Sequence, residues 1–359
     1  MATCRWRHKK IIKEQKMKKK RLIMLSSVAV LAIMVVLSGH AQAQQKVIEL
    51  TYGTPWGADH TFSIADKKWI AKIEKETNGR VKITPYWGGQ IIGGQNQVEE
   101  LAAGAADIGY ILPVNSKTGF QIGKATMLFF AGANDNSGSR AFKALRAKFP
   151  EIEKEYTDAG IKPLQWQGMV NEIISRKPVR KLADVKGLRI KVIGDYSKVF
   201  AALGAEGVSI SNADVYVNMQ KGILDATTAP MEVVESLKFA DVAKYVPMFG
   251  FYPAPQSQRA MNLSKWKSLP PDIQKVFENN VDYWEQVTLE AVAAANAHAM
   301  EFGKKAGVEF IPISAEDKAK LQTLTVSIAE KDAKDLDAKG IRATQILQES
   351  QRLIKQYAK

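Results

Sequence analysis

Cysteine is almost absent from this chain. The one cysteine among 359 residues is Cys4, close to the N-terminus. Without a second thiol the chain forms no internal disulfide, and a Cys-based metal site is excluded as well. Histidine is also scarce, because only His60 and His298 lie beyond residue 43. A histidine metal cluster is therefore not expected in the body of the chain.

Sequence signatures of catalysis are lacking too. The chain contains no G-x-S-x-G, no H-E-x-x-H, no Walker loop and no Rossmann glycine fingerprint. These absences argue against an enzyme, and no cofactor is expected.

The N-terminal segment has the layout of an export signal. Ten Lys and Arg residues against one acid precede an apolar run from Leu22 to Ser38, and a small-residue site follows at Ala41-Gln42-Ala43. Residues 1–43 are thus predicted to be a cleaved signal peptide, with translation beginning at Met1 or Met17. The alternative is a retained anchor, since an apolar run of this length lies at the lower limit for spanning a bilayer.

Most of the positive charge belongs to this segment. Its removal lowers the formal net charge from +14 to +5, and no basic stripe interleaved with aromatic residues remains. Nucleic acid is therefore not an expected partner. Because about 316 residues exceed one typical core, two domains are expected.

The body of the chain opens with an alternation of strands and helices. Residues 47–53, 81–86 and 107–112 are predicted strands. A helix with Asp59 or Thr61 as N-cap and another near residues 98–103 separate them. This order is typical of a parallel sheet covered by helices. The fold class is therefore α/β.

A second α/β unit is predicted further on. Its strands are 188–193, 209–210 and 224–228, and its helices are 196–203 and 214–221. Candidate strands at 164–168, 172–175 and 258–262 would cross between the two units.

The C-terminal third is predicted to be helical. One helix of 30–35 residues between Pro271 and Ala306 would be roughly 50 Å long and would run along both domains. Ser314 and Asp317 form a capping-box start for another helix, and residues 341–358 form the last.

Several segments, in this order and spacing, resemble the DctP-type substrate-binding proteins of TRAP transporters across the whole body of the chain. They are Tyr52–His60, Gly79–Val81, Tyr86–Gly94, Leu101–Asp107, Lys177–Val179, Asp184–Val192, Asp214–Tyr216 and Gln220–Asp225.

The resemblance implies a two-lobed periplasmic binding protein fold (type II-like) with the long helix bracing both lobes. Lobe I would comprise residues 44–173 and 257–300, and lobe II residues 174–256 and 301–359. It further implies a monomeric periplasmic protein that closes over a small organic-acid ligand and delivers it to the TRAP membrane permease subunits. A binding protein that serves a sensor or an ABC-type permease is the alternative.

The resemblance also implies the site residues. Relatives hold the ligand carboxylate with an arginine, but Lys191 stands at that position here, and an ammonium cannot form the two parallel bonds of a guanidinium. Lys191 is still the expected anion contact, with Arg189 as its competitor and Lys177 as a second cation. The other expected ligand-binding residues are Trp56, His60, Trp87, Tyr110, Leu112, Asn212, Tyr216 and Thr228. Such a pocket suits a carboxylate with an apolar or aromatic body.

Overall fold

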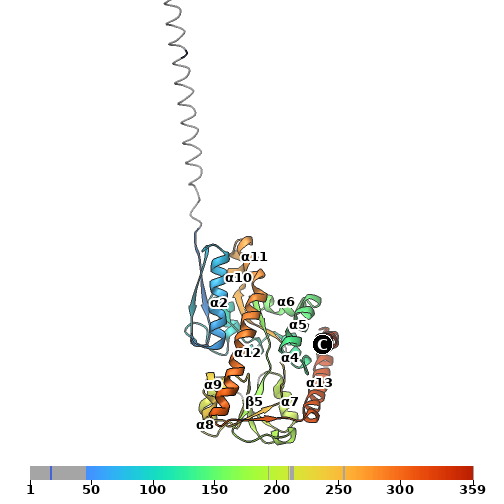
Figure 1. Ribbon diagram of the computed structural model, residues 1–359. Coiled ribbons are helices and arrows are strands. Elements are labelled where there is room, and N and C mark those ends of the chain that lie inside the picture. The colour runs from blue at the N-terminus through green and yellow to red at the C-terminus, as the bar shows by residue number, and fades with distance from the viewer. Residues whose placement is uncertain are drawn as a thin grey trace, which may run out of the picture. The chain divides into compact units, whose positions relative to one another are not determined.

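Two β-sheets form the framework of the protein. The computed structural model describes residue 17 and residues 46–192, 194–208, 210, 214–253 and 255–358, and Ile48–Lys359 form one compact unit (Figure 1). One sheet has the strand order β2-β1-β3-β10-β4, and the other has the order β11-β9-β5-β8-β6-β7. We call the parts built on these sheets lobe I and lobe II.

Lobe I begins with the predicted alternation. The elements are β1 (Ile48–Gly53), α2 (Thr61–Glu76), β2 (Val81–Tyr86), α3 (Gln97–Ala102) and β3 (Ile108–Tyr110). Both β2 and β3 pair with β1 in parallel. Helix α2 buries Phe62, Ala65, Trp69 and Ile73, which recur at helical spacing on its inner face.

Lobe II repeats this pattern with β6 (Arg189–Lys191), α7 (Tyr196–Ala202), β7 (Glu206–Gly207), α8 (Val215–Gln220) and β8 (Ala226–Ala229). The short strand predicted at 209–210 was wrong in position. Glu206 and Gly207 pair with Arg189 and Ile190 instead, Ile210 is not in a strand, and Ser209 lies outside the described residues.

Two chain segments cross between the sheets. The first links β4 (Ile161–Gln167) of lobe I to β5 (Glu172–Ser175) of lobe II, and the second links β9 (Tyr245–Met248) of lobe II to β10 (Gln256–Asn262) of lobe I. An antiparallel bridge between Asn171 and Phe251 joins them. The candidate strands of the sequence therefore lie where the chain changes lobe.

The crossings are packed tightly. Tyr252, on the second crossing, lies so close to Gly138 and Gly168 that a Cβ atom at either glycine would come within 2.2 or 2.6 Å of its side chain. Only a residue without a side chain fits at these two positions, because real Cβ atoms do not approach other atoms so closely.

The predicted single long helix is two helices. Helix α11 (Pro271–Asn279) and helix α12 (Val281–Lys305) meet at Asn280. The buried Asn280 side chain donates hydrogen bonds to Glu76 Oε2 at 2.5 Å and to the Val276 carbonyl at 2.8 Å. Composition could not show this interruption, because neither Gly nor Pro marks it.

Helix α12 nevertheless braces both lobes, as expected. It is about 37 Å long at 1.5 Å per residue. It contacts α2 and β4 in lobe I, and α9 (Val233–Ser236) and β11 (Glu309–Pro312) in lobe II. In lobe I its Trp284 stacks on Trp69 of α2 with ring centroids 3.6 Å apart.

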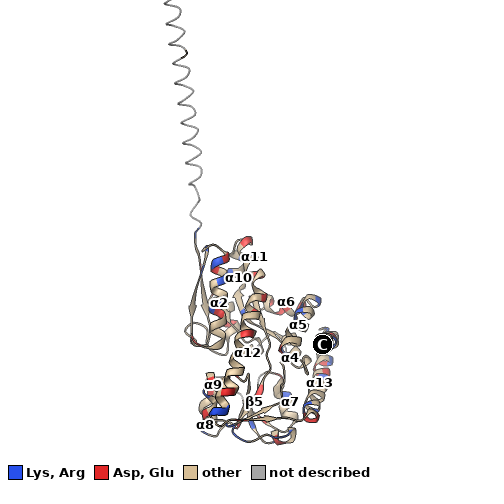
Figure 2. Ribbon diagram, in the orientation of Figure 1, with Lys and Arg blue, Asp and Glu red and all other residues tan. Residues whose placement is uncertain are grey.

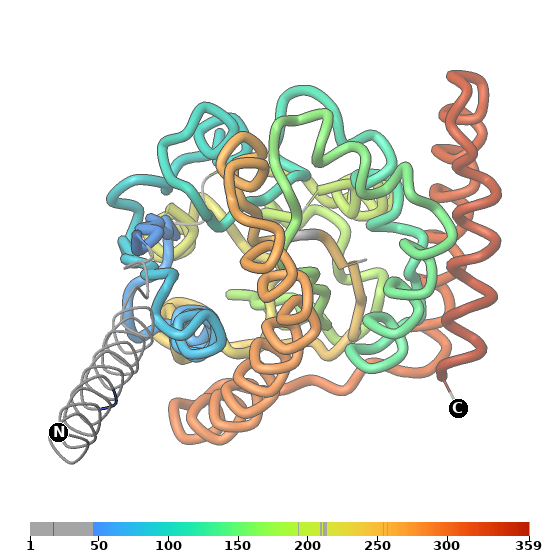
Figure 3. The backbone as a smooth tube through the Cα atoms, turned by 90° about the horizontal axis from the view of Figure 1, so that it is seen from above, coloured from blue at the N-terminus to red at the C-terminus, as the bar shows by residue number. Residues whose placement is uncertain are grey.

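The C-terminal helices lie together on one side of this unit (Figure 3). Helix α13 (Ala315–Asp337) begins at the predicted cap, where Ser314 accepts a hydrogen bond from the Asp317 amide. It contacts α4 (Gln121–Phe129) and α7, while α14 (Ala343–Tyr357) packs on α5 (Asp135–Lys148). The domain boundaries inferred from the sequence stay a prediction.

The remaining described elements are the helices α6 (Glu151–Asp158) and α10 (Leu263–Ser268) and the 3₁₀ turns Pro113–Asn115, Leu182–Val185 and Phe239–Asp241.

Acidic and basic residues are interspersed along the outer helices (Figure 2). Many form exposed pairs within a helix, such as Lys154 with Asp158 at 2.6 Å. In the part of the chain that the structure describes, no helix combines the length and the apolar character that a membrane span requires. The expected export signal lies outside the described residues, apart from Met17.

Candidate functional site

A cavity of about 130 Å³ lies between the two sheets. Its lobe I wall comes from the segment after β1, the start of α2, the end of β3 and β4, and its lobe II wall from β6, β8 and α9. The first crossing and the second crossing also contribute. The lining residues are Trp56, Phe62, Tyr110, Leu112, Val114, Met127, Gln167, Gly168, Met169, Asn171, Lys191, Val215, Thr227–Pro230, Glu232, Val233, Leu237, Phe239, Pro253, Gln256 and Gln258.

The lobe I wall is aromatic. Trp56 meets Phe62 and Tyr110 edge-on, with ring centroids 5.6 and 5.7 Å apart, and burial raises the pKa of Tyr110 to about 12. Edge-on packing of this kind favours a rigid arrangement of rings. Trp56, Phe62 and Tyr110 therefore form a fixed aromatic surface, and Leu112 packs against the same cluster.

His60 supports this wall from behind. Its ring stacks on Trp56 at 4.4 Å between centroids, and it does not line the cavity itself. His60, rather than Asp59 or Thr61, is the N-cap of α2, since its Nδ1 accepts a hydrogen bond from the Phe62 amide at 3.2 Å. Burial, with a smaller contribution from Arg259, lowers the pKa of His60 to about 4, so the imidazole is neutral near pH 7.

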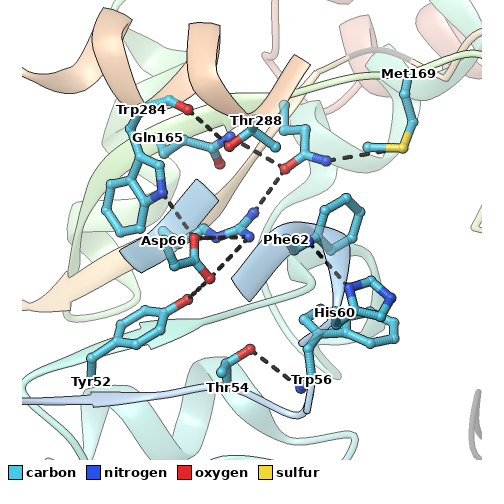
Figure 4. Close-up of polar contacts among 12 residues, drawn as sticks. Tyr52, Thr54, Trp56, His60, Phe62, Asp66, Gln165, Met169, Trp284 and Thr288 are labelled. Atoms are coloured by element: carbon cyan, nitrogen blue, oxygen red, sulfur yellow. Dashed lines mark hydrogen bonds and ion pairs between the residues drawn. The ribbon is translucent and has the colours of Figure 1, made fainter. Parts of the chain in front are cut away.

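A buried ion pair holds the same wall in place (Figure 4). Arg259 on β10 and Asp66 on α2 are both fully buried, and their closest atoms are 3.1 Å apart. Asp66 also accepts hydrogen bonds from Tyr52 Oη at 2.5 Å and from Trp284 Nε1 at 2.9 Å. The Asp66 carboxylate thus joins β1, α2, β10 and α12 at one point.

The ion pair reaches the cavity through Gln167. Arg259 Nη1 donates to Gln167 Oε1 at 2.7 Å, and Gln165 Nε2 donates to the same oxygen at 3.2 Å. With its oxygen held from two sides, Gln167 has its amide nitrogen oriented toward Met169, whose sulfur is 3.9 Å away. Both Gln167 and Met169 line the cavity.

Lys191 lies on the opposite wall. It is at the end of β6, where it pairs in register with Thr227 of β8, and both residues line the cavity together with Thr228. Loss of water around the ammonium lowers the pKa of Lys191 to about 8. Among the described residues of the cavity wall, Lys191 is the only Lys or Arg.

Arg189 and Lys177 lie elsewhere. Both form ion pairs with the buried Asp225 at 3.0 Å, and Arg189 donates two hydrogen bonds to the two oxygens of that carboxylate. These bonds outweigh burial and keep the pKa of Asp225 well below its usual range. Neither Arg189 nor Lys177 lines the cavity. Asp225 pairs with both of them, including Arg189, which the sequence suggested as an alternative anion contact.

Two other expected residues, Trp87 and Tyr216, are also not on the cavity wall. Trp87 packs edge-on against Tyr52 at 5.9 Å, and Tyr216 packs against the apolar core of lobe II. Asn212 lies outside the described residues. The expected ligand-binding residues that do line the cavity are Lys191, Trp56, Tyr110, Leu112 and Thr228, and their contact with a ligand stays a prediction.

Sequence reasoning missed much of the wall. Gly168, Met169 and Asn171 belong to the first crossing, and their place between two candidate crossing strands was the signal that could have found them. Glu232 carried no such signal. It comes next to His60 and Thr61 only through the fold, from more than 170 positions away in the sequence.

A two-lobed α/β unit with a small apolar cavity between its sheets has the architecture of a binding protein that encloses a small solute. The chain belongs to the bacterial extracellular solute-binding protein family 7, or DctP family, whose model matches residues 52–335. This confirms the family that the sequence motifs suggested.

Similar proteins cover most of the chain. The monocarboxylate 2-oxoacid-binding periplasmic protein of Nostoc sp. is 24% identical over 297 residues, which is 78% of each chain. The TRAP solute binding protein of Rhodoferax ferrireducens, solved with copurified benzoate, has a TM-score of 0.78 at 22% identity and covers 87% of this chain and 99% of its own.

A third similar protein is a TRAP periplasmic solute binding protein from Bordetella bronchiseptica, solved with bound (R)-mandelate and (S)-mandelate. It has a TM-score of 0.76 at 20% identity and covers 86% of this chain and 99% of its own. Together these structures confirm the two-lobed periplasmic binding protein fold.

The buried ion pair gives a first prediction, on stability. Asp66→Asn removes the negative charge that pairs with the buried Arg259, so the free energy of unfolding should fall by about 3–5 kcal/mol. Denaturant titration measures this loss. The matched control is Asp158→Asn, which breaks an exposed pair and should cost below about 1 kcal/mol. Equal, small losses in both variants would contradict a structural role for the pair.

Proposed function

We propose that this protein is the periplasmic solute-binding subunit of a TRAP-type transporter and that it captures a small organic anion. The ligand has one carboxylate and an apolar or aromatic body, and the protein delivers it to the membrane permease subunits. The observation that carries the proposal is the placement of Lys191 on one wall of a cavity whose opposite wall is aromatic.

The chemistry of the two walls supports this class of ligand. A partly dehydrated ammonium gains more from a carboxylate than an exposed one does, because water screens the pair less. Trp56, Phe62 and Tyr110 offer ring faces and edges to the rest of the ligand. The exposed surface of the cavity wall is mostly apolar, which favours an apolar or aromatic body over the many hydroxyl groups of a sugar acid.

The similar proteins point the same way. The Rhodoferax ferrireducens protein carries benzoate and the Bordetella bronchiseptica protein carries mandelate, and each of these acids is one carboxylate on an aromatic body. The Nostoc relative is named for monocarboxylate 2-oxoacids. Aromatic and branched 2-oxo acids are therefore the first ligands to test, alongside mass spectrometry of whatever copurifies.

A second prediction concerns Lys191 itself. Lys191→Met should cost about 2–5 kcal/mol of affinity for the identified acid, because the ligand carboxylate would be buried without a charged partner. Stability of the free protein should not fall, since a dehydrated charge is removed. Isothermal titration calorimetry and thermal unfolding measure the two quantities.

Lys191→Arg and Lys177→Met sharpen this experiment. Arginine should keep or improve affinity if the cavity admits the larger guanidinium. Lys177 has an exposed side chain and pairs with Asp225, so Lys177→Met should leave the affinity unchanged. Loss of affinity in Lys177→Met, with none in Lys191→Met, would show that Lys177 and not Lys191 is the anion contact.

A third prediction follows from the pKa of Lys191. In the free protein this pKa is about 8, and a bound carboxylate raises it. The dissociation constant should therefore be constant below about pH 8 and increase above it, up to the pKa of the complex. Titrations between pH 6 and pH 10 measure this increase. Lys191→Arg should abolish the pH dependence, because a guanidinium stays charged throughout, and a flat profile in the unsubstituted protein would exclude Lys191 as the anion contact.

A fourth prediction concerns export. If signal peptidase reads Ala41 and Ala43, the mature chain begins at or near Gln44. Intact-mass analysis of the protein from a periplasmic fraction measures this terminus. Recovery of an uncleaved chain from the membrane fraction would favour the retained anchor instead.

A further inference from the structure

One carboxyl group faces the ligand cavity. Among the described residues that line it, Glu232 is the only Asp or Glu, and its side chain is only 2% exposed. The backbone around it is fixed, because the Glu232 amide donates a hydrogen bond to Asn296 Oδ1 on α12 at 2.8 Å. The negative charge of a buried glutamate repels an anionic ligand, so the presence of Glu232 beside this cavity requires a physical explanation.

The Glu232 oxygens have only long contacts with lobe I. Thr61 Oγ1 lies 3.5 Å from Oε2, and His60 Nε2 lies 3.9 Å from Oε1. Other buried carboxyl groups of this chain are held much more closely. Glu155 accepts two amide hydrogen bonds at 2.8 and 2.9 Å, and Glu172 accepts one at 2.8 Å. Glu232 accepts hydrogen bonds from the hydroxyl groups of Ser236 and Thr61 instead, which leaves it further acceptor capacity because a carboxylate has about four lone-pair sites.

His60 does not neutralise this carboxyl group. Its Nδ1 accepts the Phe62 amide hydrogen, so the single proton of the neutral ring is on Nε2, the nitrogen that is nearest to Glu232. A separation of 3.9 Å is too long for a hydrogen bond. The Nε2–H donor of His60 on lobe I and the carboxyl acceptor of Glu232 on lobe II thus face each other without forming a hydrogen bond.

We propose that Glu232 is a specificity-determining residue that accepts a hydrogen bond from a hydroxyl group on the body of the bound acid. The inference rests on the proposed function and narrows its ligand class to hydroxylated aromatic acids. Lys191 would bind the carboxylate, the rings of lobe I would bind the body, and Glu232 would select the substituent.

A hydroxyl group fits this position better than an ammonium group. Burial, which outweighs hydrogen bonds from Ser236 and Thr61, raises the pKa of Glu232, and an ammonium ligand would require the carboxyl group to be fully ionised. A hydroxyl group can donate to a carboxylate and can also accept from a protonated carboxyl group. An acid without the hydroxyl would displace water from Glu232 and leave its oxygens without a replacement, which lowers affinity.

The test compares matched acids by calorimetry. Benzoate and phenylacetate are titrated beside their 2-, 3- and 4-hydroxy derivatives. For the unsubstituted protein, at least one hydroxylated acid should bind roughly 10- to 100-fold more tightly than its parent, the range expected for a hydrogen bond to a charged group. This ratio of dissociation constants is the readout, because it separates selection of the hydroxyl group from general loss of binding.

Three variants locate the source of the ratio. Glu232→Met has similar volume and no acceptor oxygen, so the ratio should fall to about one. Glu232→Gln keeps a carbonyl oxygen and should retain part of the preference, and it also serves if the methionine variant does not fold. Glu235→Gln is the matched control three residues further on, in α9, where the glutamate pairs with the exposed His298. Its ratio should equal that of the unsubstituted protein.

The outcomes separate the two proposals. If none of these acids binds the unsubstituted protein, the proposed ligand class fails and this inference fails with it. If the acids bind but no hydroxyl group improves affinity, or if the preference survives in Glu232→Met and Glu232→Gln alike, the inference alone is overturned. A preference that Glu235→Gln abolishes as fully as Glu232→Met does would also overturn it.

Discussion

The buried pair of Asp66 and Arg259 is the interaction on which the ligand cavity depends. Two charges at zero exposure are costly to remove from water, and their attraction offsets that cost only when further hydrogen bonds satisfy the remaining donors and acceptors. Here Tyr52, Trp284 and Gln167 supply such bonds from three other elements. The consequence is geometric. Because the pair tolerates little displacement, it fixes α2 and β10 against each other, and with them the aromatic wall that begins at the N-terminus of α2.

In lobe II, ion pairing leaves one of three neighbouring cations on the cavity wall. Strand β6 carries two cations with one residue between them, and both would attract any nearby anion. Asp225 binds Arg189 through both carboxylate oxygens and also forms an ion pair with Lys177. That arrangement removes two of the three cations from competition for the ligand. It leaves Lys191 on the cavity wall, where loss of water makes its charge responsive to a bound carboxylate.

Features that depend on neighbours in the sequence were predicted better than features that depend on contacts between distant residues. Periodicity and capping predicted β1, β2, α7 and the start of α13 correctly, because neighbours in the sequence decide these elements. The break at Asn280 depends on a contact with Glu76 that only the fold creates. The cap at His60 is a local contact with the Phe62 amide, but histidine is not among the usual N-cap residues. The pairing of Arg189 with Asp225 spans 36 positions, and the contact of Glu232 with Thr61 spans 171. No local pattern encodes such pairs, so the sequence predicted the class of site better than its residues.

The position of the cavity links ligand contact to the arrangement of the lobes. Met169 and Asn171 on the first crossing and Pro253 on the second crossing line the cavity, and Asn171 is bridged to Phe251. Any change in the angle between the lobes must be taken up by backbone rotation in these few residues and by movement at the contacts of α12 and α13, because both helices pack on elements of the two lobes. A change of angle therefore also changes the distance between Lys191 on lobe II and the aromatic wall on lobe I. A ligand that bridges those walls has a different binding free energy at each angle. Because a ligand shifts a conformational equilibrium only through such a difference, a bridging ligand can favour one arrangement of the lobes over another.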